Sequence, residues 1–297
     1  MSPGRTAVAI HHALACAMSL ALIPHSARAD WSAALQARAR YDDNVGDAQS
    51  SDDIVADWIV SAAASVYQLF PLGDHYSVTV AGNVGGESYH QIDGLSNAYV
   101  GGALSLRRRW GLGAFAPWAR LGVQSTRSDY RDDYRNGWLN RVSFAVGQRI
   151  DERWNIQGEY AWERRTAPTQ PQEVAGISGN AFSTSSQSLS AGIEFSLLQN
   201  TYLTFGVSGR HGDVVSTTLD HYDQLSASRA IAADPAFGSI AYAYKLTATT
   251  WGANAGIKVA PISHGLLGLE FQRLDAHADG GHYYVKAVLA LTWDYGF

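Results

Sequence analysis

The last 15 residues of the chain alternate between two kinds of side chain. Aromatic or aliphatic residues occupy every odd position, and the residues between them are smaller or polar. A period of two predicts a β-strand whose two faces meet different surroundings. The apolar face consists of Tyr283, Val285, Ala287, Leu289, Leu291, Trp293, Tyr295 and Phe297.

The same alternation recurs in 11 earlier segments, so the sequence predicts 12 strands. The pattern is weaker at 115–125 and at 237–245, which leaves ten or fourteen strands as open alternatives. The 11 segments are 31–41, 58–66, 76–84, 98–106, 119–123, 142–146, 154–162, 189–197, 203–207, 251–259 and 267–271.

The predicted connections alternate in length along the chain. Short turns are predicted at 71–74, 110–113, 150–152, 199–200 and 261–264. Longer polar loops are predicted at 43–53, 89–96, 126–137, 165–186, 210–245 and 274–281. Short periplasmic turns opposite long extracellular loops are typical of a transmembrane barrel, which pairs every backbone amide by closing on itself. A soluble β-sandwich, the alternative, does not explain the unequal connections.

The terminal strand ending in Phe297 resembles that of the Gram-negative outer-membrane β-barrel superfamily, and the resemblance covers 30–297. It implies an all-β, antiparallel up-and-down transmembrane barrel of about 12 strands in the cell outer membrane. Outer-membrane lipid and lipopolysaccharide are then expected partners. The resemblance also implies that the barrel insertion machinery recognises the C-terminal strand. The barrel is porin-like, and no subfamily is matched.

We predict that residues 1–29 are a cleaved signal peptide, because Arg5 precedes a short apolar run and small residues flank Arg28 before the expected cleavage site. Lipidation at Cys16 is the alternative, although the residues before it match a lipidation box poorly. Cleavage would remove the only cysteine and leave 20 basic against 27 acidic residues. We therefore expect no disulfide and no nucleic-acid partner in a barrel of 30–297.

The inward positions of the predicted strands carry many small residues, which in a barrel of this size leave room for water. We therefore predict a monomeric, porin-like channel for passive diffusion of small hydrophilic solutes, without cofactor, metal or catalytic residues. Charged side chains at membrane depth require water or an opposite charge. The predicted pore-lining residues are Arg38, Arg40, Arg107, Arg120, Arg141, Arg149, Glu159, Glu163, Glu194 and Lys286.

Two interpretations of these charges remain open. Arginines concentrate on the fourth to sixth predicted strands and glutamates on the seventh and eighth, which would create a field across the lumen that selects solutes. Alternatively, neighbouring charges such as Arg141 and Glu159 form ion pairs that stiffen the wall. The long loop 210–245 either folds inward as a constriction or decorates the surface. The mixed charges of 127–135 suit either contact with lipopolysaccharide or a solvated loop.

Other functions remain as alternatives. A lipid hydrolase would need a nucleophile, a histidine and an acid in contact. The candidates that lie close in sequence are His211 with Asp213 and Ser216, His221 with Asp223, and His277 with Asp279 and His282. A structural or export-associated barrel, for surface polymer or lipoprotein assembly, is the second alternative. The acidic residues Asp43, Asp47, Asp52 and Asp53 favour a solvated loop over a Ca²⁺ site, since the regular ligand spacing is missing.

Overall fold

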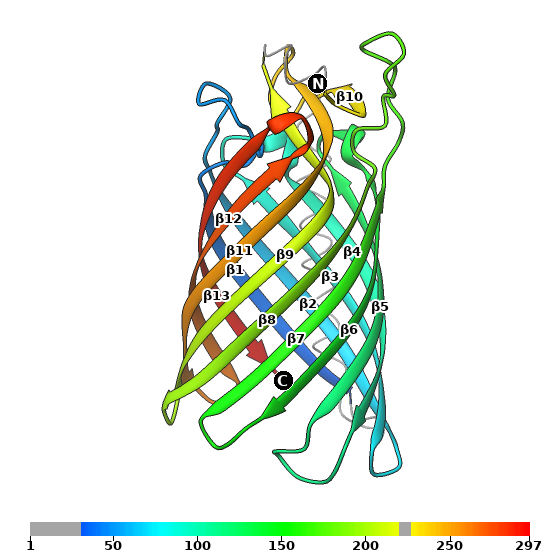
Figure 1. Ribbon diagram of the computed structural model, residues 1–297. Helices are drawn as coiled ribbons and strands as arrows, with labels where there is room; N and C mark the ends of the chain where they lie inside the picture. Colours follow the sequence, from blue (N-terminus) through cyan, green and yellow to red (C-terminus); the bar gives the residue numbers. More distant parts are fainter. Residues whose placement is uncertain (1–30, 220–226) are drawn as a thin grey trace.

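The computed structural model describes residues 31–219 and 227–297, which form a closed antiparallel β-barrel (Figure 1). Twelve long strands build its wall, so the predicted count is confirmed and ten or fourteen strands are excluded. They are β1 (Trp31–Asp42), β2 (Asp57–Leu72), β3 (Tyr76–Tyr89), β4 (Asn97–Arg109), β5 (Trp118–Tyr130), β6 (Gly137–Arg149), β7 (Trp154–Thr166), β8 (Thr184–Leu198), β9 (Thr201–Thr218), β11 (Tyr242–Ile262), β12 (Gly265–Ala278) and β13 (Tyr283–Gly296). A short extra strand, β10 (Ala230–Ala233), pairs with the start of β11.

The pairing of the first strand with the last closes the barrel, and the pairing of β9 with β11 completes the wall across their long connection. Strand β1 pairs with β13, and the backbone N–H of Phe297 donates to the carbonyl of Ala33 at 2.9 Å. Strand β9 pairs with β11 along its whole length, from Thr201 opposite Val259 to Thr218 opposite Tyr242. Closure leaves the sheet without a free edge, which is the condition for a sheet to lie in lipid.

The outer face of the wall is apolar, as the alternation predicts. On β13, Leu289 and Leu291 are exposed on the outside of the barrel, whereas Ala290 between them is buried. Aromatic pairs occupy both ends of this face, with ring centroids 5.1 Å apart for Tyr41 and Trp58 and 4.6 Å apart for Trp154 and Phe195. These pairs form the aromatic girdles expected at the two membrane interfaces.

The short and long connections separate to opposite ends of the barrel (Figure 1). Three of the long loops contain a single helical turn, η1 (Asp93–Leu95), η2 (Asp133–Arg135) and η3 (Asp279–Gly281). We refer to the long-loop end as extracellular and to the short-turn end as periplasmic. Among the described residues, no helix is long and apolar enough to cross a membrane.

Several predicted loop boundaries are wrong because the strands extend above the membrane. The loop predicted at 126–137 is reduced to 131–136, and the one predicted at 210–245 is reduced to 219–241. Strands of 13 to 21 residues at these sites exceed the roughly 10 residues that span the hydrocarbon. Their extracellular ends stand in water and tolerate polar outward residues. The turn predicted at 110–113 is four residues longer, since β5 begins only at Trp118, and the turn predicted at 150–152 is one residue longer.

Candidate transport pathway and its extracellular cap

Three cavities follow one another along the inside of the barrel. The lower cavity, at the periplasmic end, has a volume of about 480 Å³, the middle cavity about 620 Å³, and the upper cavity, at the extracellular end, about 540 Å³. The lower and middle cavities share Asn155 and Glu194 in their walls. The middle and upper cavities share Ser190, Ser208 and Gln272. The shared walls make the three cavities successive parts of one lumen.

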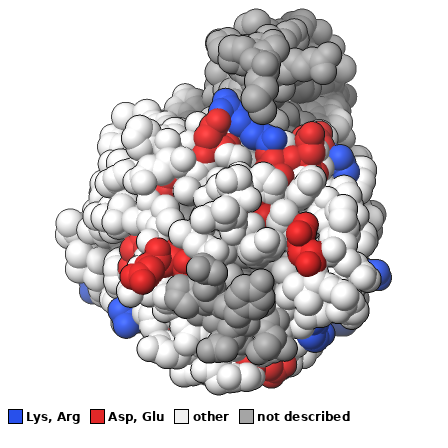
Figure 2. Space-filling model, turned by 90° about the horizontal axis from the view of Figure 1, so that it is seen from above, with Lys and Arg blue, Asp and Glu red and all other residues white. Residues whose placement is uncertain are grey.

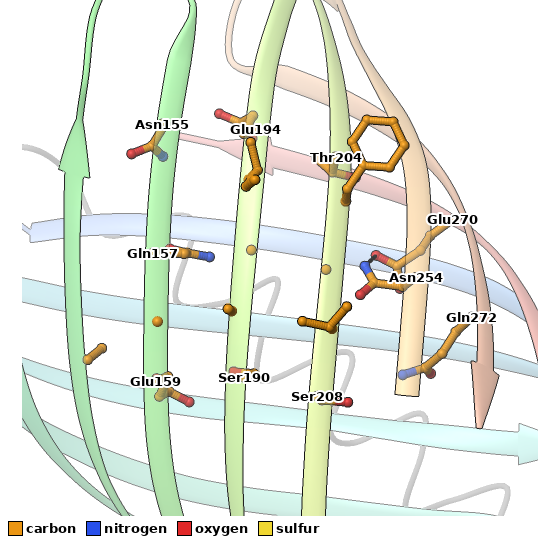
Figure 3. A pocket seen from close by; sticks show the side chains of 18 of the residues that line it. Asn155, Gln157, Glu159, Ser190, Glu194, Thr204, Ser208, Asn254, Glu270 and Gln272 are labelled. Atoms are coloured by element: carbon orange, nitrogen blue, oxygen red, sulfur yellow. Dashed lines mark hydrogen bonds between the residues drawn. The ribbon is translucent and has the colours of Figure 1, made fainter. Parts of the chain in front are cut away.

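The middle cavity has a predominantly polar inner wall (Figure 3). Strands β7, β8, β9, β11 and β12 contribute most of its lining residues, and β5 and β6 add Arg120 and Ala145. Asn254 donates to Glu270 at 3.4 Å across two of these strands. The labelled polar residues are Asn155, Gln157, Glu159, Ser190, Glu194, Thr204, Ser208, Asn254, Glu270 and Gln272. Such a wall can hold water and hydrogen-bond to hydrophilic solutes.

The predicted arginine and glutamate sectors meet in a chain of ion pairs. Arg141 on β6 binds both Glu159 and Glu163 on β7. Glu159 also lies 3.5 Å from Arg120 on β5. The wall-stiffening interpretation therefore describes these four residues, because their charges largely compensate one another. Glu194 is compensated in the same way by Lys258, at 3.6 Å.

Lys286 lies on the inner face and approaches two acids of the neighbouring wall. Its Nζ is 3.3 Å from Asp42 and 2.5 Å from Asp47. Arg40 is also paired, with Glu87 at 3.3 Å and the Tyr89 hydroxyl at 3.0 Å. These two clusters stand at the extracellular end of the lumen.

The remaining predicted arginines have no carboxylate partner among the described residues. Arg149 donates to the backbone carbonyls of Asp151 at 3.1 Å and Glu152 at 2.6 Å. The Nε atoms of Arg38 and Arg107 are buried and have no hydrogen-bond partner in the described part of the chain.

Two ion-pair partners, Glu87 and Lys258, were not among the predicted pore-lining residues. Both occupy inward positions in the alternation of β3 and β11. Extending the predicted third strand by three residues would have included Glu87. Lys258 lies inside a predicted strand, at an even position, which the alternation of that strand assigns to the lumen.

The described part of the β9–β11 connection lies across the extracellular mouth as a cap. We define the cap segment as residues 230–241. Its first residues pack in two small apolar clusters: Ala230 and Ala232 contact Phe182, while Ile231 packs with Tyr244. The N–H of Ile231 also donates to the carbonyl of Ser178 at 2.9 Å. These contacts join the cap segment to the β7–β8 loop.

The cap segment spans the mouth to the far side of the barrel. Six strands separate the β9–β11 connection from the β3–β4 loop in either direction around the wall, so the two lie opposite each other. Ala236 nevertheless packs directly on Gly94 of that loop, where a Cβ would lie only 2.6 Å from the Ala236 Cα. Seen from above, described residues cover the centre of this end (Figure 2). The described part of the predicted loop is therefore neither a constriction inside the lumen nor loose decoration.

A buried ion pair fastens the cap segment to the β5–β6 loop. Both terminal oxygens of Asp234 accept hydrogen bonds from Arg135, at 2.8 and 2.7 Å, and one also accepts from the Thr217 hydroxyl at 2.7 Å. Asp234 is fully buried. Arg135 further stacks on the ring of Phe182, with its Cζ 4.4 Å from the centroid. Asp132 lies in the same loop as Arg135. Burial raises the pKa of the Asp132 carboxyl, although the Tyr134 N–H and Arg135 oppose this shift. We call the pair of Arg135 and Asp234 the latch.

Of the four loop acids that the sequence predicted to form a solvated tip, only Asp52 is exposed. Asp47 binds Lys286, and Asp53 accepts from the Thr218 hydroxyl at 2.7 Å. Asp43 accepts from the N–H of Ala287 at 2.7 Å. These carboxylates instead connect the β1–β2 loop to other strands. No cluster of three or more potential metal-ligating side chains occurs within 31–219 and 227–297.

The hydrolase candidates are not brought together by the fold. His211 is exposed beside Thr249, whereas Ser216 is buried. Asp213 instead accepts from the N–H of Ser185. In the other cluster, His277 contacts Asp275 rather than Asp279, and His282 contacts Gln49. His221 and Asp223 lie outside the described residues.

No protein family model matches the chain, and no curated protein matches it in sequence. Among solved structures, it is similar to an outer membrane channel from Pseudomonas putida F1, with 10% identity, a TM-score of 0.53 and coverage of 93% of this chain and 100% of that chain. It is also similar to the NanC porin, with 8% identity, a TM-score of 0.47 and coverage of 88% and 98%. LpxR from Salmonella typhimurium gives 9% identity, a TM-score of 0.39 and coverage of 87% and 99%. The similarity to the Pseudomonas putida channel shows that the chain has the fold of outer-membrane β-barrels.

Proposed function

We propose that the protein is an outer-membrane channel for passive diffusion of small hydrophilic solutes, and that the conformation described here is its closed state. The observation that carries the proposal is the succession of three cavities along the lumen, each connected to the next by shared wall residues. The outer surface is apolar and suited to lipid, while the lumen is lined by amides, hydroxyls and charged side chains. Outer-membrane lipid, lipopolysaccharide and the barrel insertion machinery are the partners we propose with this function.

The size of the lumen supports small solutes rather than folded proteins. Its cavities of about 480 to 620 Å³ each correspond to the volume range of small-molecule sites. A barrel of eight strands would be filled by its own side chains, whereas twelve strands leave this space open.

Passage requires that the cap segment leave the mouth. Its described contacts include the latch, the pairing of β10 with β11, the packing of Ala236 on Gly94, and the apolar clusters around Phe182 and Tyr244. We propose that the cap segment alternates between a docked and an undocked position while the wall stays intact, because the pairing of β9 with β11 completes the wall without it.

We expect the refolded protein to give discrete current steps in a planar lipid bilayer, because an undocked cap exposes a hydrated lumen. Recordings in potassium chloride at several voltages test this expectation. Protein inactivated by boiling before reconstitution provides the control for leaks caused by detergent. The proposal is wrong if neither the wild type nor variants with a broken latch conduct above background.

A further inference from the structure

Two arginines face each other directly across neighbouring strands inside the lumen. Arg107 on β4 and Arg120 on β5 are register partners, and both occupy inward positions of their strands. Like charges placed directly opposite each other destabilise a sheet. Arg120 is partly compensated by Glu159 at 3.5 Å, but Arg107 has no acidic partner in 31–219 and 227–297. A facing pair of arginines in which one has no acidic partner calls for an explanation other than wall stability.

A tryptophan positions both guanidinium groups without neutralising them. The Cζ of Arg107 lies 4.6 Å from the Trp118 ring centroid, and that of Arg120 lies 5.9 Å from it. A cation stacked on an indole gains roughly 0.5 to 2 kcal/mol while it keeps its full charge. The position of Trp118 depends on Gly147, where a Cβ would lie 2.6 Å from the ring. The two arginines are therefore held in place with their charge available.

The surroundings of Arg107 carry excess positive charge. The lower cavity is lined by four arginines and two glutamates, namely Arg107, Arg109, Arg149, Arg153, Glu152 and Glu194. Of these, Glu194 is shared with Lys258. Arg149 is oriented by backbone carbonyls, which leaves its charge uncompensated as well.

The arginine pair lies where the lower cavity meets the middle cavity. Arg107 lines the lower cavity and Arg120 lines the middle one. A solute that moves between these two parts of the lumen passes the pair. The planar guanidinium presents several N–H donors in a fixed fork, which matches the oxygens of a carboxylate or phosphate.

We propose that Arg107 and Arg120, positioned by Trp118, form a binding subsite for the carboxylate or phosphate group of a small anionic solute. This proposal rests on the channel function and specifies the class of solute that the channel favours. The bound anion supplies the negative charge that the wall lacks, so the repulsion between the two arginines is relieved only while the solute is present.

Calorimetric titration of the refolded protein with citrate and with pyrophosphate tests the subsite. We expect at least one of them to bind, and Arg107→Gln to weaken that binding by roughly tenfold or more, as expected for loss of a charged hydrogen-bond donor. Binding of citrate alone or pyrophosphate alone identifies which anionic group is preferred. Equal affinity of Arg107→Gln and the wild type for both probes, or binding of neither, overturns the proposal.

The matched control is Arg108→Gln, which removes an arginine at the next position on β4. Arg108 stacks on Tyr76 and Trp110 of the outer face and lines none of the three cavities, so anion binding should not change. Arg107→Lys keeps the charge but loses the fork, and we expect an intermediate affinity. All variants are compared after the folded barrel has been verified by its altered gel mobility without heating.

Ion selectivity separates this proposal from the channel proposal. In a gradient of potassium chloride, the wild type should prefer chloride, and Arg107→Gln should lower that preference. If the protein conducts but shows no preference for chloride and binds neither citrate nor pyrophosphate, the subsite proposal is wrong and the channel proposal stands. Arginine-dependent binding by a protein that never conducts contradicts the channel and leaves the subsite standing.

Discussion

Replacing Asp234 with alanine is expected to raise the ratio of open to closed channels by at least a hundredfold. Asp234 is fully buried and accepts hydrogen bonds from both Arg135 and Thr217. Removal of one partner of a buried ion pair costs about 3 to 5 kcal/mol, because the other charge is left uncompensated. Here the cost falls on the docked position of the cap segment, since Arg135 regains water when the cap leaves. Each 1.4 kcal/mol changes the ratio of docked to undocked molecules by about tenfold.

Single-channel recording measures this effect as the fraction of time spent open. Asp129→Ala is the matched control, because Asp129 is an exposed acid at the same end of the barrel whose ion pair with Arg127 does not involve the cap. An exposed pair of this kind contributes only about 0 to 1 kcal/mol. Open fractions that stay the same in Asp234→Ala and Arg135→Ala would show that the latch does not hold the mouth closed.

The wall of the barrel could be predicted from the sequence because its determinants are local. Alternation assigns each residue to lipid or lumen without knowledge of its neighbours, and it placed Arg141 and Glu159 on the same face. Strand ends were less predictable. Above the membrane the outward positions become polar, so segments such as Arg127 to Tyr130 lose the apolar signal although they remain in β5.

The contacts between loops could not be predicted in this way. Asp234 meets Arg135 across 99 positions of the chain, and Ala236 meets Gly94 across the whole mouth. No periodicity connects these residues, and their encounter depends on the closed ring of strands. The cross-strand pairing of Arg107 with Arg120 was not predicted for a related reason. It depends on the register that the β4–β5 turn imposes, and this turn was predicted to be shorter than it is.

The second large effect concerns Lys286, whose replacement by methionine should destabilise the folded barrel by about 3 kcal/mol or more. The Lys286 side chain is only 12% exposed and approaches two acids, Asp42 and Asp47, that are themselves mostly buried. Without the lysine, these carboxylates face each other in the wall at the base of the β1–β2 loop. Urea unfolding of the protein in lipid vesicles, followed by tryptophan fluorescence, measures the loss.

Lys258→Met is the control for the loss of a lumen lysine. The pair of Lys258 and Glu194 is more than a third exposed on both sides and spans 3.6 Å, so its loss should cost at most about 1 kcal/mol. Comparable destabilisation of the two variants would contradict the argument, because burial distinguishes them.

The pH dependence of the Lys286→Met variant provides a second check on the same cluster. Burial raises the pKa of the Asp47 carboxyl, and Lys286 opposes this shift in the wild type. In the variant the opposition is gone, so the pKa in the folded state rises further above its unfolded value. A carboxyl with a raised pKa binds its proton more tightly in the folded state than in the unfolded state. The loss of stability caused by its ionisation is therefore complete above the folded-state pKa, and it disappears as the pH falls below the unfolded-state pKa. The variant should approach wild-type stability in acid, and Asp47→Asn in the same chain should restore part of the loss at neutral pH. A deficit that persists unchanged in acid and in the double variant would instead assign the effect to packing of the methionine.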